Sequence, residues 1–121
     1  LAILNDEITA RQEVSGRYDL PLSAAGLRTP QVAQHSVSAW AQYTIRVADR
    51  ASVQAALKTA GIPTAVHYSL PLNRQPAAAN PEACLPAGDK AADEVLSLPM
   101  HPYLKEEDQL TIADVLRNAV K

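Results

Sequence analysis

The first residues of the chain are apolar at helical spacing. Leu1, Leu4 and Ile8 fall on one face of a helix. We expect this helix to cover residues 1–19 and to end before Pro21, which lacks the backbone N–H that a helix interior needs. No capping residue or polar segment precedes the pattern, so we expect the beginning of the helix to be missing.

In the next part of the chain, a segment without hydrophobic periodicity is followed by one in which polar and apolar side chains alternate. Residues 21–36 mix Pro, Gly, Ser and Gln, which predicts a loop with a short strand around residues 29–33. Residues 38–47 alternate between polar and apolar side chains and predict a strand with one buried face. On this strand we expect Trp40 in the core and Arg46 in solvent.

A helix with clear end signals follows the predicted strand. Asp49 can cap a helix over residues 50–60, and Gly61 stands where a left-handed residue ends it. Residues 62–68 then form a second extended run. The centre of the chain therefore predicts a strand–helix–strand nucleus.

The last third contains more helix breakers. Residues 69–89 hold four prolines and allow only one or two helical turns. We expect a short helix over residues 90–97, an extended piece at residues 98–100 and a turn at residues 101–103. Residues 105–119 predict a final amphipathic helix with acidic residues in its first turn.

The composition fits one small domain. The chain has 121 residues, 47% of them hydrophobic and only 4% aromatic, with no Phe. Alanine is abundant and buries little area, so we expect Leu, Ile, Val, Trp40 and the four tyrosines to form a thin core.

The charge and the single cysteine exclude several classes of protein. With 11 basic and 13 acidic residues and no basic cluster, the chain lacks the charge pattern of nucleic-acid binding. No apolar run reaches a membrane span of roughly 20 residues and no leader opens the chain, so we expect no membrane partner and a cytoplasmic location. Cys84 excludes an internal disulfide. We expect it to be a small buried apolar residue.

Few residues in the chain are of the types that bind metals or act in catalysis. The three histidines and the cysteine, His35, His67, His101 and Cys84, do not stand at zinc-ligand spacing. These four residues could form a metal site only if folding brings them together. The glycine-rich phosphate loops and hydrolase turns are absent too.

His67 and Tyr68 are the most informative pair, because they end an extended run and open the proline-rich segment. There, polar side chains can project from a rigid support. Read from the residues alone, the pair favours a structural role: Tyr68 packs on the domain and His67 binds a backbone carbonyl. His101, between two prolines, is likewise expected to be a turn residue.

Three segments of the chain carry a resemblance to a known family. They are residues 61–76 (GIPTAVHYSLPLNRQP), residues 41–45 (AQYTI) and residues 95–104 (VLSLPMHPYL). Together they resemble the DegT/DnrJ/EryC1/StrS family of sugar-nucleotide aminotransferases, which use pyridoxal phosphate. Ser69 replaces a proline common in the family. Asn73 stands where many members have a histidine. An asparagine here is similar to the branch of the family that aminates C3 of a UDP-linked 3-keto-2-acetamido glucuronic acid for lipopolysaccharide O-antigen.

The resemblance implies a fold and a division of the chain. It implies the small C-terminal domain of the aspartate-aminotransferase fold (PLP fold type I), an α+β domain with a short antiparallel sheet packed against helices. Residues 1–20 would be the inter-domain helix, truncated at its start, and residues 21–121 the small domain. The parent enzyme is implied to be a homodimer.

The resemblance also implies the site. His67, Tyr68 and Asn73 would bind the UDP-sugar, which reverses the structural reading of His67. None of the four lysines stands in anything similar to the family's cofactor-lysine motif, so we expect neither catalytic residues nor bound pyridoxal phosphate in this chain alone. The parent would take an amino-acid donor, glutamate. The alternative from another class is a free-standing α+β ligand-binding or interaction module without cofactor.

Overall fold

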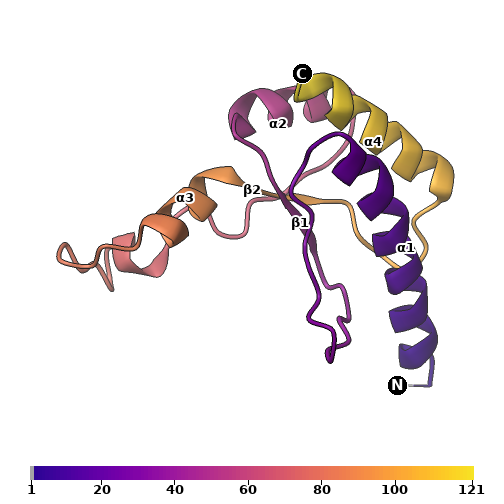
Figure 1. Cartoon of the computed structure of the whole chain (residues 1–121), viewed down its shortest axis with the longest axis horizontal. Helices are drawn as coiled ribbons and strands as arrows, with labels where there is room; N and C mark the ends of the chain where they lie inside the picture. Colours follow the sequence, from indigo (N-terminus) through magenta and orange to yellow (C-terminus); the bar gives the residue numbers. More distant parts are fainter. Residues whose placement is uncertain (1) are drawn as a thin grey trace.

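The computed structural model describes residues 2–121, so Leu1 of the predicted apolar face lies outside the described residues. In chain order the elements are α1 (Leu4–Ala24), β1 (Tyr43–Arg46), α2 (Arg50–Thr59), the 3₁₀ helix η1 (Leu72–Arg74), α3 (Pro86–Glu94), β2 (Val95–Leu98) and α4 (Glu106–Ala119). Figure 1 shows α1, α2 and α4 gathered around one end of the two strands, while η1 and α3 project away from them. We call residues 68–94, which include η1 and α3, the arm.

A short antiparallel sheet forms the centre of the molecule. β1 pairs with β2, with Tyr43 opposite Leu98. Ala65 adds one antiparallel bridge to Ser97 on the other edge of β2, through two hydrogen bonds of 3.1 and 2.8 Å. β2 therefore lies between β1 and the segment that follows α2. The α+β class and the antiparallel sheet are as expected from the sequence.

Aromatic side chains hold the core together although they are few. The rings of Tyr18 and Tyr43 lie 4.9 Å apart and those of Trp40 and Tyr43 lie 5.7 Å apart, measured between centroids. Trp40 is buried, as predicted. The expectation that all four tyrosines pack in the core is wrong, because Tyr68 and Tyr103 are 76% and 69% exposed.

Helix α1 continues through Pro21 to Ala24, so the predicted end before Pro21 is wrong. The last turn is retained because it brings Leu22 into complete burial. Gly26 provides the real stop: its φ is +77°, and the N–H of Leu27 donates to the Leu22 carbonyl at 3.1 Å. Glycine adopts this left-handed conformation without steric cost.

Helix α2 agrees with its predicted end signals. The Asp49 carboxylate accepts a hydrogen bond of 3.0 Å from the Ser52 N–H. Gly61 has a φ of +74°, and the Ile62 N–H donates to the Leu57 carbonyl at 2.9 Å, which completes the C-terminal cap.

The strands differ most from expectation. The predicted helix over residues 90–97 ends at Glu94, and Val95–Leu98 is strand β2 because it finds β1 as a hydrogen-bonding partner. The predicted strand over residues 38–47 shrinks to Tyr43–Arg46, and Trp40 before it has a φ of +47°, which is not extended. The strand expected at residues 29–33 does not form, and the nearest pairing is a single bridge at Arg28. The strand expected at residues 62–68 is reduced to a single bridge at Ala65.

A buried glutamine joins α1 to α4. Gln109 is 3% exposed; its Nε2 donates to the Val14 carbonyl at 2.9 Å, and its Oε1 accepts a bond of 2.6 Å from Arg17 Nε. A second Arg17 nitrogen donates to the Leu104 carbonyl at 3.0 Å. These bonds hold the long first helix against the body of the domain. Within residues 2–121, no helix has both the length and the apolar character needed to cross a bilayer.

Candidate functional site

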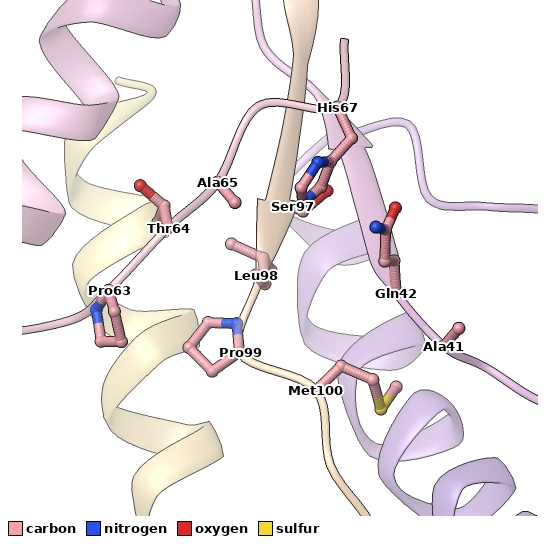
Figure 2. Close-up of a pocket in the computed structure, with 10 residues that line it drawn as sticks. All are labelled: Ala41, Gln42, Pro63, Thr64, Ala65, His67, Ser97, Leu98, Pro99 and Met100. Atoms are coloured by element: carbon pink, nitrogen blue, oxygen red, sulfur yellow. The ribbon is translucent and has the colours of Figure 1, made fainter.

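A pocket of about 250 Å³ opens where three segments meet: the residues before β1, the segment after α2 and the end of β2. Figure 2 shows the side chains that line it. Four are polar: Gln42, Thr64, His67 and Ser97. The rest are apolar: Ala41, Pro63, Ala65, Leu98, Pro99 and Met100.

The sheet determines which side chains reach this pocket. Successive side chains of a strand point to opposite faces. Tyr43 and Ile45 are fully buried against the helices, which leaves Gln42 and Thr44 on the other face. Ser97 lies opposite Thr44, and their hydroxyl oxygens are 2.8 Å apart in a hydrogen bond. The sheet therefore places Gln42 beside a hydroxyl pair.

The polar side chains of the pocket have bonding capacity to spare. Within residues 2–121, Gln42, Thr64 and His67 make no side-chain hydrogen bond, whereas Ser97 is paired with Thr44. In Figure 2, Gln42 and His67 lie near Ser97 at one end of the pocket, and Pro63 and Pro99 lie at the other. Polar side chains therefore cluster at the Gln42 end, and the other end is mainly apolar, with Thr64 beside Pro63.

Among the described residues that line the pocket, His67 is the only titratable one. Among the described residues that line it, none is Lys, Arg, Asp or Glu. An amide donates and accepts hydrogen bonds, and a neutral imidazole donates from one nitrogen and accepts at the other. The arrangement is therefore suited to a neutral polar group that also has an apolar part.

The structure brings together two of the three predicted substrate residues. The ring of Tyr68 meets that of His67 edge to face, with 5.9 Å between centroids. Tyr68 does not pack on the domain, so the structural reading of this residue is wrong. Asn73 lies apart from the pocket, in η1 of the arm. Its backbone carbonyl accepts a hydrogen bond of 2.9 Å from Asn80, and its side-chain oxygen is buried without a partner among the described residues.

Sequence reasoning missed Gln42 and Ser97 as site residues. Gln42 stood on the polar side of the predicted strand, and this alternation was the available signal. Ser97 was assigned to a helix, which gave no reason to place it beside His67. Nothing in the sequence separates the pocket side of the sheet from an ordinary solvent-facing side.

Two other predicted environments are wrong. Arg46 is not freely solvated: its guanidinium binds the Glu94 carboxylate at 2.9 and 2.6 Å, and its side chain is only 28% exposed. Cys84 is exposed rather than buried, because it lies on the projecting arm and not over the core.

The three histidines and the cysteine could form a metal site only if folding gathered them. The part of the chain that the structure describes holds no group of three or more His, Cys, Asp or Glu side chains placed to bind a metal ion.

Comparison with known proteins assigns the chain to a family. The sequence pattern of the DegT/DnrJ/EryC1/StrS aminotransferases matches residues 1–117. The chain belongs to this family.

Individual DegT/DnrJ/EryC1/StrS relatives match over nearly the whole chain. A UDP-2-acetamido-2-deoxy-3-oxo-D-glucuronate aminotransferase of Pseudomonas aeruginosa is 52% identical over 98% of the chain, which spans 33% of that protein. A crystal structure of a family member from Brucella abortus superposes with a TM-score of 0.91 at 39% identity, over 99% of this chain and 33% of that one. Streptomyces venezuelae DesV, in complex with a ketimine intermediate, superposes with a TM-score of 0.93 at 30% identity, over 100% of this chain and 34% of that one. The chain thus spans about a third of the length of these relatives.

The lysines of this DegT/DnrJ/EryC1/StrS chain do not fit a pyridoxal phosphate site. A Schiff-base lysine must stand in a pocket that also holds the cofactor. All four lysines, Lys58, Lys90, Lys105 and Lys121, are exposed. Lys90 and Lys105 lie 3.7 and 3.6 Å from the glutamates Glu94 and Glu107. No step of cofactor chemistry can be derived from these residues.

Proposed function

We propose that this chain is the small C-terminal domain of a pyridoxal-phosphate-dependent aminotransferase that moves an amino group from glutamate to C3 of a UDP-linked keto-sugar. The observation that carries the proposal is the 52% identity over 98% of the chain with the Pseudomonas aeruginosa relative, whose name specifies a 3-oxo UDP-sugar. We further propose that the product is a 2-acetamido-3-amino glucuronic acid used for lipopolysaccharide O-antigen, and that the parent enzyme is a homodimer.

In this proposal the chain closes the active-site cleft and binds substrate. Residues 1–20 connect it to the large domain that holds the cofactor, and residues 21–121 form the closing domain. His67 lines a pocket with its imidazole free of intramolecular bonds in the described chain, and the exposed Tyr68 is placed directly beside it. The arm would bring Asn73 to the same substrate. The isolated chain would be inactive, because no residue in it is proposed to hold the cofactor.

The test uses the full-length enzyme that contains this domain. His67→Ala and Tyr68→Phe should each weaken binding or turnover of the UDP-sugar while the small domain stays folded. Losing a neutral hydrogen bond costs about 0.5 to 1.5 kcal/mol, and losing one to a charged substrate group about 1.5 to 3 kcal/mol. Both residues are exposed, so their substitution removes little packing.

The measurement is steady-state amino transfer, followed by mass spectrometry of the UDP-sugar product with glutamate as donor. His35→Ala is the matched control, because His35 is exposed in the loop before β1 and does not line the pocket. Normal kinetics in both His67→Ala and Tyr68→Phe, or activity lost only in step with thermal stability, would refute a binding role for the pair. A wild-type enzyme without amino transfer would refute the proposed function itself.

A further inference from the structure

The pocket beside His67 contains a residue that the proposed function does not yet use. Gln42 lies at the polar end with His67 and Ser97 (Figure 2), and its amide makes no hydrogen bond to any described residue. A primary amide offers two donors and two accepting lone pairs in one plane. It is therefore a complementary partner for another planar amide, which also donates and accepts side by side.

The remaining surface of the pocket restricts the group further. Pro63, Leu98 and Pro99 line its apolar part. The whole pocket has a volume of about 250 Å³, which leaves room for a small group rather than a whole nucleotide. A group that fits both ends has a polar amide and an adjoining methyl group or C–H edge. Burial of that apolar edge adds favourable free energy in proportion to its area.

Charged substrate groups are a poor match for the same pocket. A phosphate or a carboxylate is bound best by arginine or lysine, and none lines this pocket. Cationic side chains gather elsewhere: Arg28, Arg46 and Lys90 line a separate pocket on the other edge of β1. The Gln42 pocket therefore selects for a neutral part of the substrate.

We propose that Gln42, assisted by His67 and Ser97, binds a neutral planar amide of the nucleotide-sugar and is a specificity-determining residue. This inference rests on the proposed function. Two parts of a UDP-linked 2-acetamido sugar have this chemistry: the acetamido substituent, with its methyl group, and the uracil ring, with its C–H edge.

The experiment measures equilibrium binding to the full-length holoenzyme by calorimetry. Three probes are used: UDP-N-acetylglucosamine has both amide sources, UDP-glucose has only the uracil ring, and UMP has the uracil ring without a sugar. Gln42→Met keeps the length of the side chain and removes its amide. Gln34→Met is the matched control, since Gln34 is exposed in a loop and does not line the pocket.

The pattern of affinities identifies the group. Loss of one neutral hydrogen bond should weaken binding about two- to twelvefold in Gln42→Met. Weakening for UDP-N-acetylglucosamine alone supports the acetamido group, and equal weakening for all three probes supports the uracil ring. Unchanged affinities, or weakening for both sugars but not for UMP, would overturn the amide assignment. A wild-type enzyme that binds none of the probes would overturn the proposed function with it.

Discussion

Two buried tyrosines show how single residues link the core to the pH dependence of stability. The Tyr18 hydroxyl donates to the Pro99 carbonyl at 2.9 Å, and the Tyr43 hydroxyl donates to the Asp19 carboxylate. Burial raises the pKa of both phenols well above the ordinary value. The charges of Asp108 and Asp19 raise the pKa of Tyr18 and of Tyr43, respectively, still further. Both phenols therefore stay protonated in the folded state when unfolded tyrosines already ionise.

The direction of these shifts predicts alkaline destabilisation. The stabilisation is complete below the unfolded pKa of about 10 and is lost as the pH rises toward the folded values, with each tyrosine removing roughly 1.4 kcal/mol per pH unit. Urea unfolding between pH 8 and pH 11 checks this, and Tyr43→Phe should reduce the slope above pH 10. Tyr68→Phe is the control because Tyr68 is exposed. A free energy of unfolding that does not fall above pH 10 would contradict the prediction.

At the scale of elements, the contact between α1 and α4 depends on the buried amide of Gln109. Gln109→Leu removes the donor to the Val14 carbonyl and the acceptor for Arg17. Leaving buried polar groups unpaired should lower the free energy of unfolding by about 2 kcal/mol. Chemical denaturation measures the change. Gln54→Leu on α2 is the control, with an expected change within about 0.5 kcal/mol, and a similar loss in both variants would show that the amide is not responsible.

The elements that were predicted correctly are those defined by local signals. Helix α2 has its cap at Asp49 and its stop at Gly61, both within a residue or two of the helix itself. Strand β2 was mistaken for helix because its partner β1 lies far away in the sequence, and four residues carry no periodicity of their own. The Arg46–Glu94 ion pair was missed for the same reason.

The site was predictable to a similar extent. His67 and Tyr68 stood at the end of an extended run, a local signal that the structure retains by placing His67 in the pocket wall. Gln42 and Ser97 join His67 only through sheet pairing and the bridge at Ala65, which are non-local. That His67, Tyr68 and Asn73 bind a substrate stays a prediction, and Asn73 lies apart from the pocket, in the arm.

At the scale of the whole molecule, the first turns of α1 present apolar surface to solvent. Ile3 and Leu4 are 59% and 46% exposed, and Figure 1 shows this end of α1 extending away from α2 and the sheet. The Tyr103 hydroxyl binds the Glu7 carboxylate at 2.6 Å, an exposed contact that holds the helix there only weakly. Exposed apolar patches favour association.

We therefore expect concentration-dependent self-association of the 121-residue chain, or fraying of its first two turns. Sedimentation velocity across a range of concentrations measures association, and hydrogen exchange measures fraying. Leu4→Gln should reduce association, whereas Leu72→Gln, an exposed leucine on the arm, serves as the comparison. First turns as well protected as the strand β1 in a strict monomer would contradict this expectation.

If this chain is the substrate-closing domain of an aminotransferase, as we propose, the cofactor lysine lies outside these 121 residues. Borohydride reduction of the full-length protein with pyridoxal phosphate, followed by peptide mass spectrometry, locates that lysine directly. We expect one saturable phosphopyridoxyl adduct, on a lysine outside this chain, and no saturable adduct when the chain is treated alone. A saturable adduct on Lys58, Lys90, Lys105 or Lys121 would contradict it.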